Sequence, residues 1–210
     1  MIKILDCGAG NADNAREQFK ELGEIEVVKI DIDPERKPDL VMDITEPWPT
    51  ETLGAFDIVY CCHVLEHIDR DKVFNTVKSM AAALKDNGEL WLTIPSLEWC
   101  AREIIRGRDD PGVQGALYGG QWTPWEYHRV LFTLKSLREL VQLVGLLPMK
   151  VYQNEFMFNL YGKDYTALGN VVIARKVPVD KENQDEPVSM EPMPETSSSH
   201  RKRNGRKRRH

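Results

Sequence analysis

The sequence predicts an α/β fold with a doubly wound, mostly parallel sheet of seven strands and an antiparallel edge strand. Short apolar runs alternate with helical patterns from the first residues onward, which is typical of parallel sheets. The last two apolar runs lie close together along the chain, which favours an antiparallel pair at the sheet edge. The expected strands are Ile2–Leu5, Glu26–Ile30, Leu40–Met42, Asp57–Cys62, Glu89–Ile94, Lys150–Met157 and Asn170–Lys176.

Three helices are expected between these strands. The first covers about Ala12–Leu22. The second covers Arg70–Leu84. Asp86-Asn87-Gly88 after it favours a residue in the left-handed αL conformation that ends the helix. The third covers Thr133–Val144, with Thr133 as its N-cap.

Two segments depart from this alternation. Residues 96–131 mix glycine, aromatic and charged residues over a length too great for a simple connection. We expect them to form a lid within a domain that spans residues 1–176. From residue 177 to 210, Pro, Glu, Ser, Asn and Gln dominate, and aromatic residues vanish. Such a segment buries too little apolar surface to offset its ordering entropy, so a disordered tail is expected there.

Charge is divided unevenly along the chain. The net charge is −5, yet the last ten residues contain seven Lys and Arg, which leaves −12 on residues 1–200. The basic run Arg201–Arg209 could contact a polyanion by neutralising phosphates, although such runs are often only solvated tails. The acidic remainder argues against a nucleic-acid groove on the domain itself.

No apolar run is long enough to span a membrane, and no secretory signal pattern is present, so a cytoplasmic location is expected. The four cysteines lack Cys-x-x-Cys spacing, which predicts reduced thiols and no zinc site.

A glycine-rich turn follows the first strand. In Asp6-Cys7-Gly8-Ala9-Gly10 the backbone can approach a ligand closely, next to the start of a helix. Asp31 ends the second strand, where a carboxylate can accept hydrogen bonds from both hydroxyls of a ribose; Asp33 is the alternative. Asp43 ends the third strand. In this order and spacing, these residues predict a nucleoside-binding enzyme.

These segments resemble class I S-adenosylmethionine-dependent methyltransferases, in the type 11-like subgroup with an FD-x-V…LEH motif. The first strand and turn resemble the D-x-G-x-G motif, and Ile30-Asp31-Ile32-Asp33-Pro34 resembles the acidic end of the second strand. The closest match is Phe56–Ile68, and Leu84–Leu90 resembles L-K-P-G-G-x-L. The resemblance covers residues 2–176 and implies a Rossmann-like sheet with S-adenosylmethionine as cofactor.

The resemblance implies cofactor contacts for the turn and for the ends of the following strands. Gly8 and Gly10 would let the chain pass under the methionine part, and Asp6 would reach its ammonium, directly or through water. Turn capping is an alternative for Asp6 and Asp43. A third option is a redox protein that binds NAD. It is disfavoured because the dinucleotide-binding motif Gly-x-Gly-x-x-Gly needs a glycine where this sequence has Asp13. The expected cofactor-binding residues are Asp6, Gly8, Gly10, Asp31, Ile32, Asp43, Ile44 and Cys62.

Candidate acid–base residues follow the fourth strand. His63 lies near the strand end, where an acceptor would sit, and a neutral imidazole suits proton transfer. His67 lies four residues on and shares a face with His63 if the segment is helical, but a packing or capping role is expected for it. His128 in the lid is a second candidate base. No third ligand is spaced for a metal, so none is expected.

The lid carries aromatic residues that could stack on an acceptor or form a small satellite core. The candidates for acceptor contact are Tyr118, Trp122 and Tyr127. The family usually has a helix before the first strand that covers the cofactor; here either the lid takes that role or the site is more open.

The expected function is methyl transfer to an oxygen or nitrogen of a small-molecule or glycan acceptor. The alternative is a nucleic-acid-associated methyltransferase or binding protein, targeted by the C-terminal basic run.

Overall fold

A computed structural model describes residues 1–10 and 13–178, and Met1–Pro178 form one compact unit. The expected tail lies outside the described residues except for Val177 and Pro178. The basic run Arg201–Arg209 also lies outside them.

Seven strands form one sheet in the order β3-β2-β1-β4-β5-β7-β6. The pairs among β1 to β5 are parallel, whereas β7 runs antiparallel to both β5 and β6. The predicted fold class is confirmed. The strands are β1 (Ile2–Cys7), β2 (Ile25–Asp31), β3 (Leu40–Val41), β4 (Phe56–Cys62), β5 (Leu84–Pro95), β6 (Leu146–Leu160) and β7 (Lys163–Lys176).

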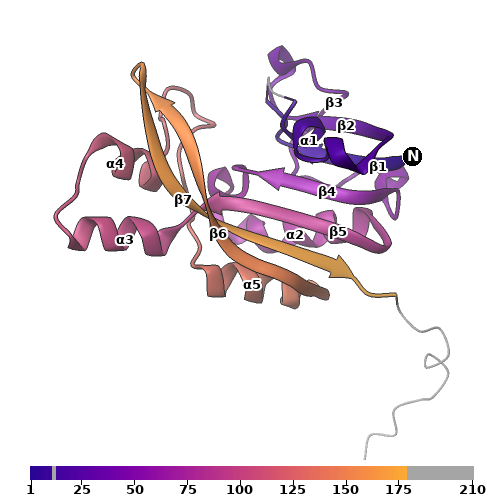
Figure 1. Ribbon diagram of the computed structural model, residues 1–210. Coiled ribbons are helices and arrows are strands. Elements are labelled where there is room, and N and C mark those ends of the chain that lie inside the picture. The colour runs from indigo at the N-terminus through magenta and orange to yellow at the C-terminus, as the bar shows by residue number, and fades with distance from the viewer. Residues whose placement is uncertain (11–12, 179–210) are drawn as a thin grey trace, which may run out of the picture. The chain divides into compact units, whose positions relative to one another are not determined.

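Helices cover both faces of this sheet (Figure 1). α2 and α5 lie together on one face, and the short α1 lies on the other, beside β1 and β2. α3 and α4 pack against each other beyond the carboxyl ends of the parallel strands. The helices are α1 (Asn14–Gln18), α2 (Arg70–Ala83), α3 (Leu97–Ile105), α4 (Pro111–Tyr118) and α5 (Leu134–Leu143).

Alternation along β4 divides the core between the two faces, because successive side chains of a strand point to opposite sides. Val59 and Cys61 belong to the larger core with α2 and α5. Ile58 and Tyr60 belong to the smaller core with Phe19, whose ring meets that of Tyr60 edge-on at 5.5 Å. The central strands are therefore buried on both sides, and their carboxyl ends are fixed in place.

Two local predictions are wrong. The helix expected over Ala12–Leu22 is only α1 followed by a 3-10 turn at Lys20–Leu22, with residues 11–12 outside the described part. Asp86-Asn87-Gly88 is no helix stop, because α2 ends at Ala83 and the chain turns extended at Leu84. Asn87 has a left-handed φ of 65° inside β5, beside a register shift against β4. Between two successive pairs β4 advances from Phe56 to Ile58 while β5 advances from Leu84 to Glu89, so β5 carries three extra residues as an irregularity there.

The helix expected over Thr133–Val144 is confirmed as α5. The Thr133 hydroxyl accepts a hydrogen bond from the Ser136 N–H, and the Ser136 hydroxyl accepts one from the Thr133 N–H. This reciprocal pair satisfies two N–H groups at the start of the helix.

The lid contains two regular helices, α3 and α4, which its glycines and charges obscured. Glycine lets α4 lie close to the β6–β7 hairpin: a Cβ on Gly115 would come within 2.3 Å of Leu160 Cδ1. The hairpin is longer than expected and turns at Tyr161 and Gly162, which have φ of 54° and 77°. Its distal half extends past the sheet beside α4 (Figure 1) and so forms a wall at the carboxyl ends of the strands.

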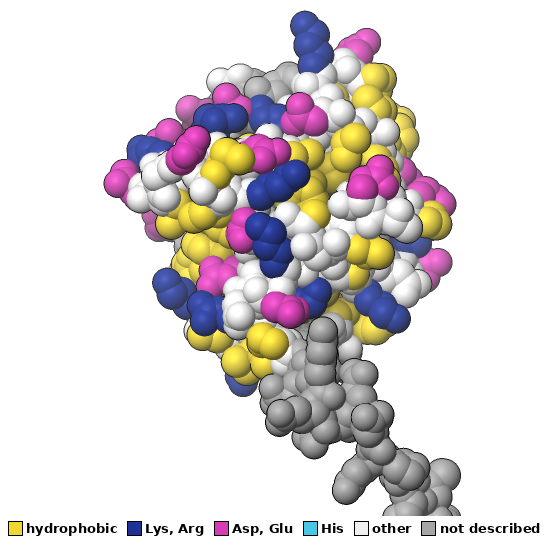
Figure 2. All heavy atoms as spheres, turned by 90° about the vertical axis from the view of Figure 1, so that its right-hand side faces the viewer, with side chains coloured by type: hydrophobic (Ala, Val, Ile, Leu, Met, Phe, Trp, Pro, Cys, Tyr) yellow, Lys and Arg dark blue, Asp and Glu magenta, His cyan; other side chains and the backbone are white. Residues whose placement is uncertain are grey.

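The face viewed in Figure 2 is at the opposite, amino-terminal end of the parallel strands. Lys and Arg side chains are interspersed there with Asp, Glu and apolar side chains, so this face presents charges of both signs. Within residues 1–10 and 13–178, no helix combines the length and apolarity needed to cross a membrane.

Candidate functional site

A cavity of about 270 Å³ opens at the carboxyl ends of β1, β2 and β4. Five of the expected cofactor residues line it: Gly8, Asp31, Ile32, Asp43 and Ile44. The strand order explains this gathering, because β2 and β4 flank β1 and their carboxyl ends meet at one edge.

The glycine turn has the conformation that the motif predicts. Gly8 and Gly10 have φ of 71° and 57°, a region that favours glycine. The N–H groups of Gly8 and Ala9 both donate to the Ile30 carbonyl, at 2.8 and 3.2 Å. A Cβ on Gly8 would lie 2.4 Å from Val64 Cγ2, so the turn can pack against the segment after β4 only without a side chain there.

Asp31 is held in place and keeps capacity for a ligand. Its Oδ2 accepts from the Gly10 N–H and its Oδ1 from the Asp33 N–H, both at 2.9 Å. Each carboxylate oxygen has a further lone pair, so the group fits a ribose diol. The Asp33 carboxylate instead accepts from the Glu35 N–H and lies 3.2 Å from Arg36 Nε, so it is engaged in a local turn.

Asp43 is placed in a similar way on the neighbouring strand end, where the Met42 N–H before it donates to the Asp31 carbonyl at 2.9 Å. Its Oδ1 accepts a 2.9 Å hydrogen bond from the Thr45 N–H, which is the turn capping that was the alternative explanation for this residue. Ile44 beside it is buried and forms part of the cavity wall.

Asp6 lies deeper than the cavity lining. Its side chain is only 3% exposed, and no donor among the described residues reaches its Oδ2. Burial raises the pKa of Asp6 to about 6, although Lys29 opposes this effect. A buried carboxylate oxygen without a donor fits the expected ammonium of the cofactor.

Gly10 and Cys62 also lie outside the cavity lining given by the described residues. Gly10 acts through its N–H on Asp31. Cys62 is half-buried at the end of β4 and lines a separate shallow hollow with Tyr60 and His63.

The lid closes one side of this first cavity through Pro124, Trp125 and Arg129. Arg129 is held at both ends: its N–H donates to the Glu66 carbonyl at 2.7 Å, and its Nη1 lies 2.9 Å from Asp69 Oδ1. No motif in the sequence distinguished Pro124 or Arg129 from the rest of the lid, and only the fold shows their place.

A second cavity of about 340 Å³ adjoins the first, and His63 and His67 line both. Its walls come from the turn after β4, from the lid and from β6. The aromatic and histidine side chains that line it are His63, His67, Trp122, His128, Phe156 and Phe158. The β6 residues were missed because the sequence suggested only an edge strand there.

The three lid aromatics predicted for acceptor contact are separated by the structure. Trp122 lines the second cavity. Tyr118 lines a smaller neighbouring hollow of about 140 Å³. Tyr127 is 45% exposed, and its main-chain carbonyl lies 3.3 Å from His67 Nδ1.

His63 lies between the two cavities, and its backbone conformation holds it there. Its φ is 55°, a strained region for a residue with a side chain, and its N–H donates to the Thr93 carbonyl at 2.8 Å. The Nδ1 atom lies 3.2 Å from Glu66 Oε1, and the ring lies 4.3 Å from that of Phe156. The helical face conditionally expected for His63 and His67 is absent, because only a 3-10 turn at Leu65–His67 forms here.

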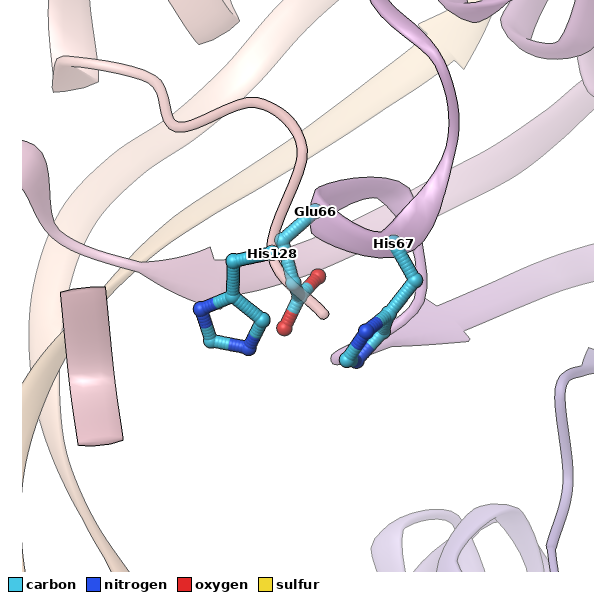
Figure 3. Close-up of side chains that lie close together, drawn as sticks. All are labelled: Glu66, His67 and His128. Carbon is cyan, nitrogen blue, oxygen red and sulfur yellow. The ribbon is translucent and has the colours of Figure 1, made fainter. Parts of the chain in front are cut away.

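Glu66, which sequence reasoning passed over, is the buried centre of this region. Its side chain is only 1% exposed and lies between His67 and His128 (Figure 3). Burial acts to raise its pKa, but the hydrogen bond from His63 and the charges of the three histidines outweigh burial and lower it. Burial lowers the pKa of His128, so this imidazole is neutral near pH 7.

The family model described as a methyltransferase domain matches residues 2–149. No curated protein matches the sequence.

Solved structures share the fold at low sequence identity. A SAM-dependent methyltransferase from Methanosarcina mazei is 20% identical, with 84% of this chain and 92% of that chain covered and a TM-score of 0.59. One from Archaeoglobus fulgidus is 17% identical over 83% and 86% of the chains, with a TM-score of 0.55. The 1,6-didemethyltoxoflavin-N1-methyltransferase of Burkholderia thailandensis, solved with 1,6-didemethyltoxoflavin and S-adenosylhomocysteine bound, is 18% identical over 84% and 72%, with a TM-score of 0.53.

Proposed function

The chain belongs to the methyltransferase-domain family and is a class I enzyme that depends on S-adenosylmethionine; we propose that it methylates an oxygen or nitrogen of a small-molecule or glycan acceptor. The observation that carries the proposal is the meeting of two cavities at His63. One cavity has carboxylates suited to a nucleoside, and the other is aromatic and of small-molecule size.

The residues of the first cavity bind and orient the cofactor. Asp31 accepts hydrogen bonds from the ribose hydroxyls, and Asp43 with Ile44 borders the adenine. Gly8 gives the backbone its close approach, and Asp6 compensates the ammonium. When bound, S-adenosylmethionine supplies an electrophilic methyl group on a sulfonium.

Residues of the lid exclude water and align the acceptor. Trp125 and Arg129 cover the cofactor cavity, and Trp122 stacks on the acceptor in the second cavity. Alignment of this kind supplies much of the rate of a two-substrate transfer.

His63 is the proposed base. Its Nδ1 donates to the buried Glu66 carboxylate, which fixes the tautomer and leaves Nε2 free to take a proton from the acceptor. His128 is the second candidate, since it lines only the acceptor cavity and is neutral near pH 7.

The test is transfer of a labelled methyl group from S-adenosylmethionine to a panel of phenols, sugars, amines and nucleic acids. The proposal expects turnover with a hydroxyl or amine of small size. His63→Asn keeps a residue that tolerates a left-handed φ and should lower kcat with little change in cofactor affinity. Turnover with nucleic acid alone would contradict the proposed acceptor class.

A further inference from the structure

We propose that Glu66, His67 and His128 bind one divalent transition-metal cation in the wall of the acceptor cavity. One ligand atom from each residue lies within 4.8 Å of the other two. Figure 3 shows the carboxylate of Glu66 between the two imidazoles, with all three side chains directed to one side of the turn after β4. All three residues also line the second cavity.

The free atoms of these side chains are the ones that a cation needs. His67 Nδ1 lies 3.3 Å from the Tyr127 carbonyl, and His128 Nδ1 lies 3.1 Å from the Ala116 carbonyl. A carbonyl only accepts, so each Nδ1 carries the proton and each Nε2 keeps a lone pair. Metal-ligating histidines are oriented in this way by their second nitrogen.

Glu66 supplies the charged ligand. Its Oε1 is occupied by His63 Nδ1, but no donor among the described residues reaches its buried Oε2. A buried carboxylate oxygen without a partner is costly, and a cation would remove that cost. The third ligand could not be predicted from motif spacing because His128 belongs to the lid, far from the LEH motif along the chain.

The ligand set identifies the class of cation. Two imidazoles and one carboxylate suit Zn²⁺, Fe²⁺, Co²⁺ or Mn²⁺ better than Mg²⁺ or Ca²⁺, which prefer oxygen ligands. Ligand atoms bound at about 2.1 Å around one cation lie roughly 3–3.5 Å apart, so binding requires only small side-chain rotations. Three protein ligands leave a position open toward the cavity.

The role of the cation rests on the proposed function, whereas its binding does not. A hydroxyl oxygen of the acceptor ligates the cation and gives its proton to His63 Nε2, while both electrons of the O–H bond stay on the oxygen. This oxygen forms a bond to the methyl carbon of the sulfonium as the carbon–sulfur bond breaks. The electron pair of that bond stays on sulfur, which yields a methyl ether, S-adenosylhomocysteine and a protonated His63. The cation thus favours an oxygen acceptor over an amine.

The experiment titrates Zn²⁺ into the full chain, made without a histidine tag and stripped with a chelator, by calorimetry. Co²⁺ absorption in the visible range reports the coordination independently. We expect one site. His128→Gln and Glu66→Gln should each weaken Zn²⁺ binding at least 100-fold, since even loss of an outer partner costs about 10–100-fold.

Two controls separate the possible results. The double variant His200→Ala, His210→Ala removes two imidazoles outside the described residues and should leave Zn²⁺ affinity unchanged. S-adenosylhomocysteine binding should survive His128→Gln, because His128 does not line the cofactor cavity. Absence of stoichiometric Zn²⁺ binding, or its loss only in the double variant, overturns the metal site. Absence of S-adenosylhomocysteine binding in a chain that binds Zn²⁺ would instead contradict the proposed function.

Discussion

The main-chain carbonyl of Glu66 accepts a hydrogen bond of 2.7 Å from the main-chain N–H of Arg129. The Val130 N–H lies 3.3 Å from the same oxygen. These bonds tie the end of the lid to the turn after β4, so the residues just before Arg129 lie beside the LEH motif. Through this tie the lid contributes Trp125 and Arg129 to one cavity and His128 to the other.

Gly119→Ala should open the lid. Gly119 has φ of 81°, and a Cβ there would lie 1.9 Å from the Glu126 carbonyl oxygen. The lid segment that contains Glu126 and His128 must therefore move to accommodate alanine. The matched control is Gly107→Ala, which has φ of 80° with open space around the new Cβ. Both changes place a side chain at positive φ, and the backbone strain is larger at Gly119, whose ψ of 178° lies in a region essentially restricted to glycine. Thermal melts should show a clearly larger loss for Gly119→Ala, and equal losses would refute the close packing.

Trp122→Ala and Trp125→Ala should each raise the KM of a different substrate. Trp122 lines the acceptor cavity and Trp125 the cofactor cavity, and both are more than half exposed, which limits folding effects. Loss of stacking is worth about 1–3 kcal/mol, so the KM for the affected substrate should rise roughly 5–150-fold. In steady-state kinetics, Trp122→Ala should raise the KM for the acceptor, and Trp125→Ala should raise the KM for the cofactor. The same pattern in both variants would contradict separate cavities.

Asp6→Asn should stabilise the protein in a pH-dependent manner. The pKa of Asp6 is raised from 3.8 to about 6 in the folded state, so the folded state binds more protons between these values. The free energy of unfolding of the parent therefore falls as pH rises through this window, by up to about 3 kcal/mol. Asp6→Asn removes this loss. Chemical denaturation at pH 4 and pH 7.5 should show a gain for the variant only at the higher pH.

The basic run should contribute polyanion binding without affecting the cofactor site. Replacing the seven Lys and Arg of residues 201–209 by Gln should abolish retention on heparin at low salt, because counterion release depends on those cations. S-adenosylhomocysteine affinity should stay unchanged. Retention that persists in the variant would place the polyanion contact on another part of the chain.

The parallel part of the sheet could be predicted from the sequence because its strands contain short apolar runs between turn residues. The cofactor cavity followed from the same pattern, since Gly8, Asp31 and Asp43 sit at adjacent strand ends and parallel strands bring those ends together. Sequence patterns gave wrong or incomplete predictions where contacts between distant segments determine the structure. Asn87 absorbs a strand irregularity rather than ending a helix, and the distal half of β6 gains its role only by meeting α4. Glu66 is recognised as part of the site only in the folded structure, where the lid brings His128 beside it.

Calorimetric titration of S-adenosylhomocysteine into the Asp31→Ala variant tests whether Asp31 holds the ribose of S-adenosylmethionine. Asp31→Ala leaves the diol without its acceptor, which should weaken binding roughly 10–150-fold, from about 1.5–3 kcal/mol for hydrogen bonds to a charged group. Asp33→Ala, two residues away, should bind like the parent chain, because its carboxylate faces Glu35 and Arg36. Equal affinity of Asp31→Ala and the parent, or binding of NAD without S-adenosylhomocysteine, would contradict an S-adenosylmethionine site with Asp31 at the ribose.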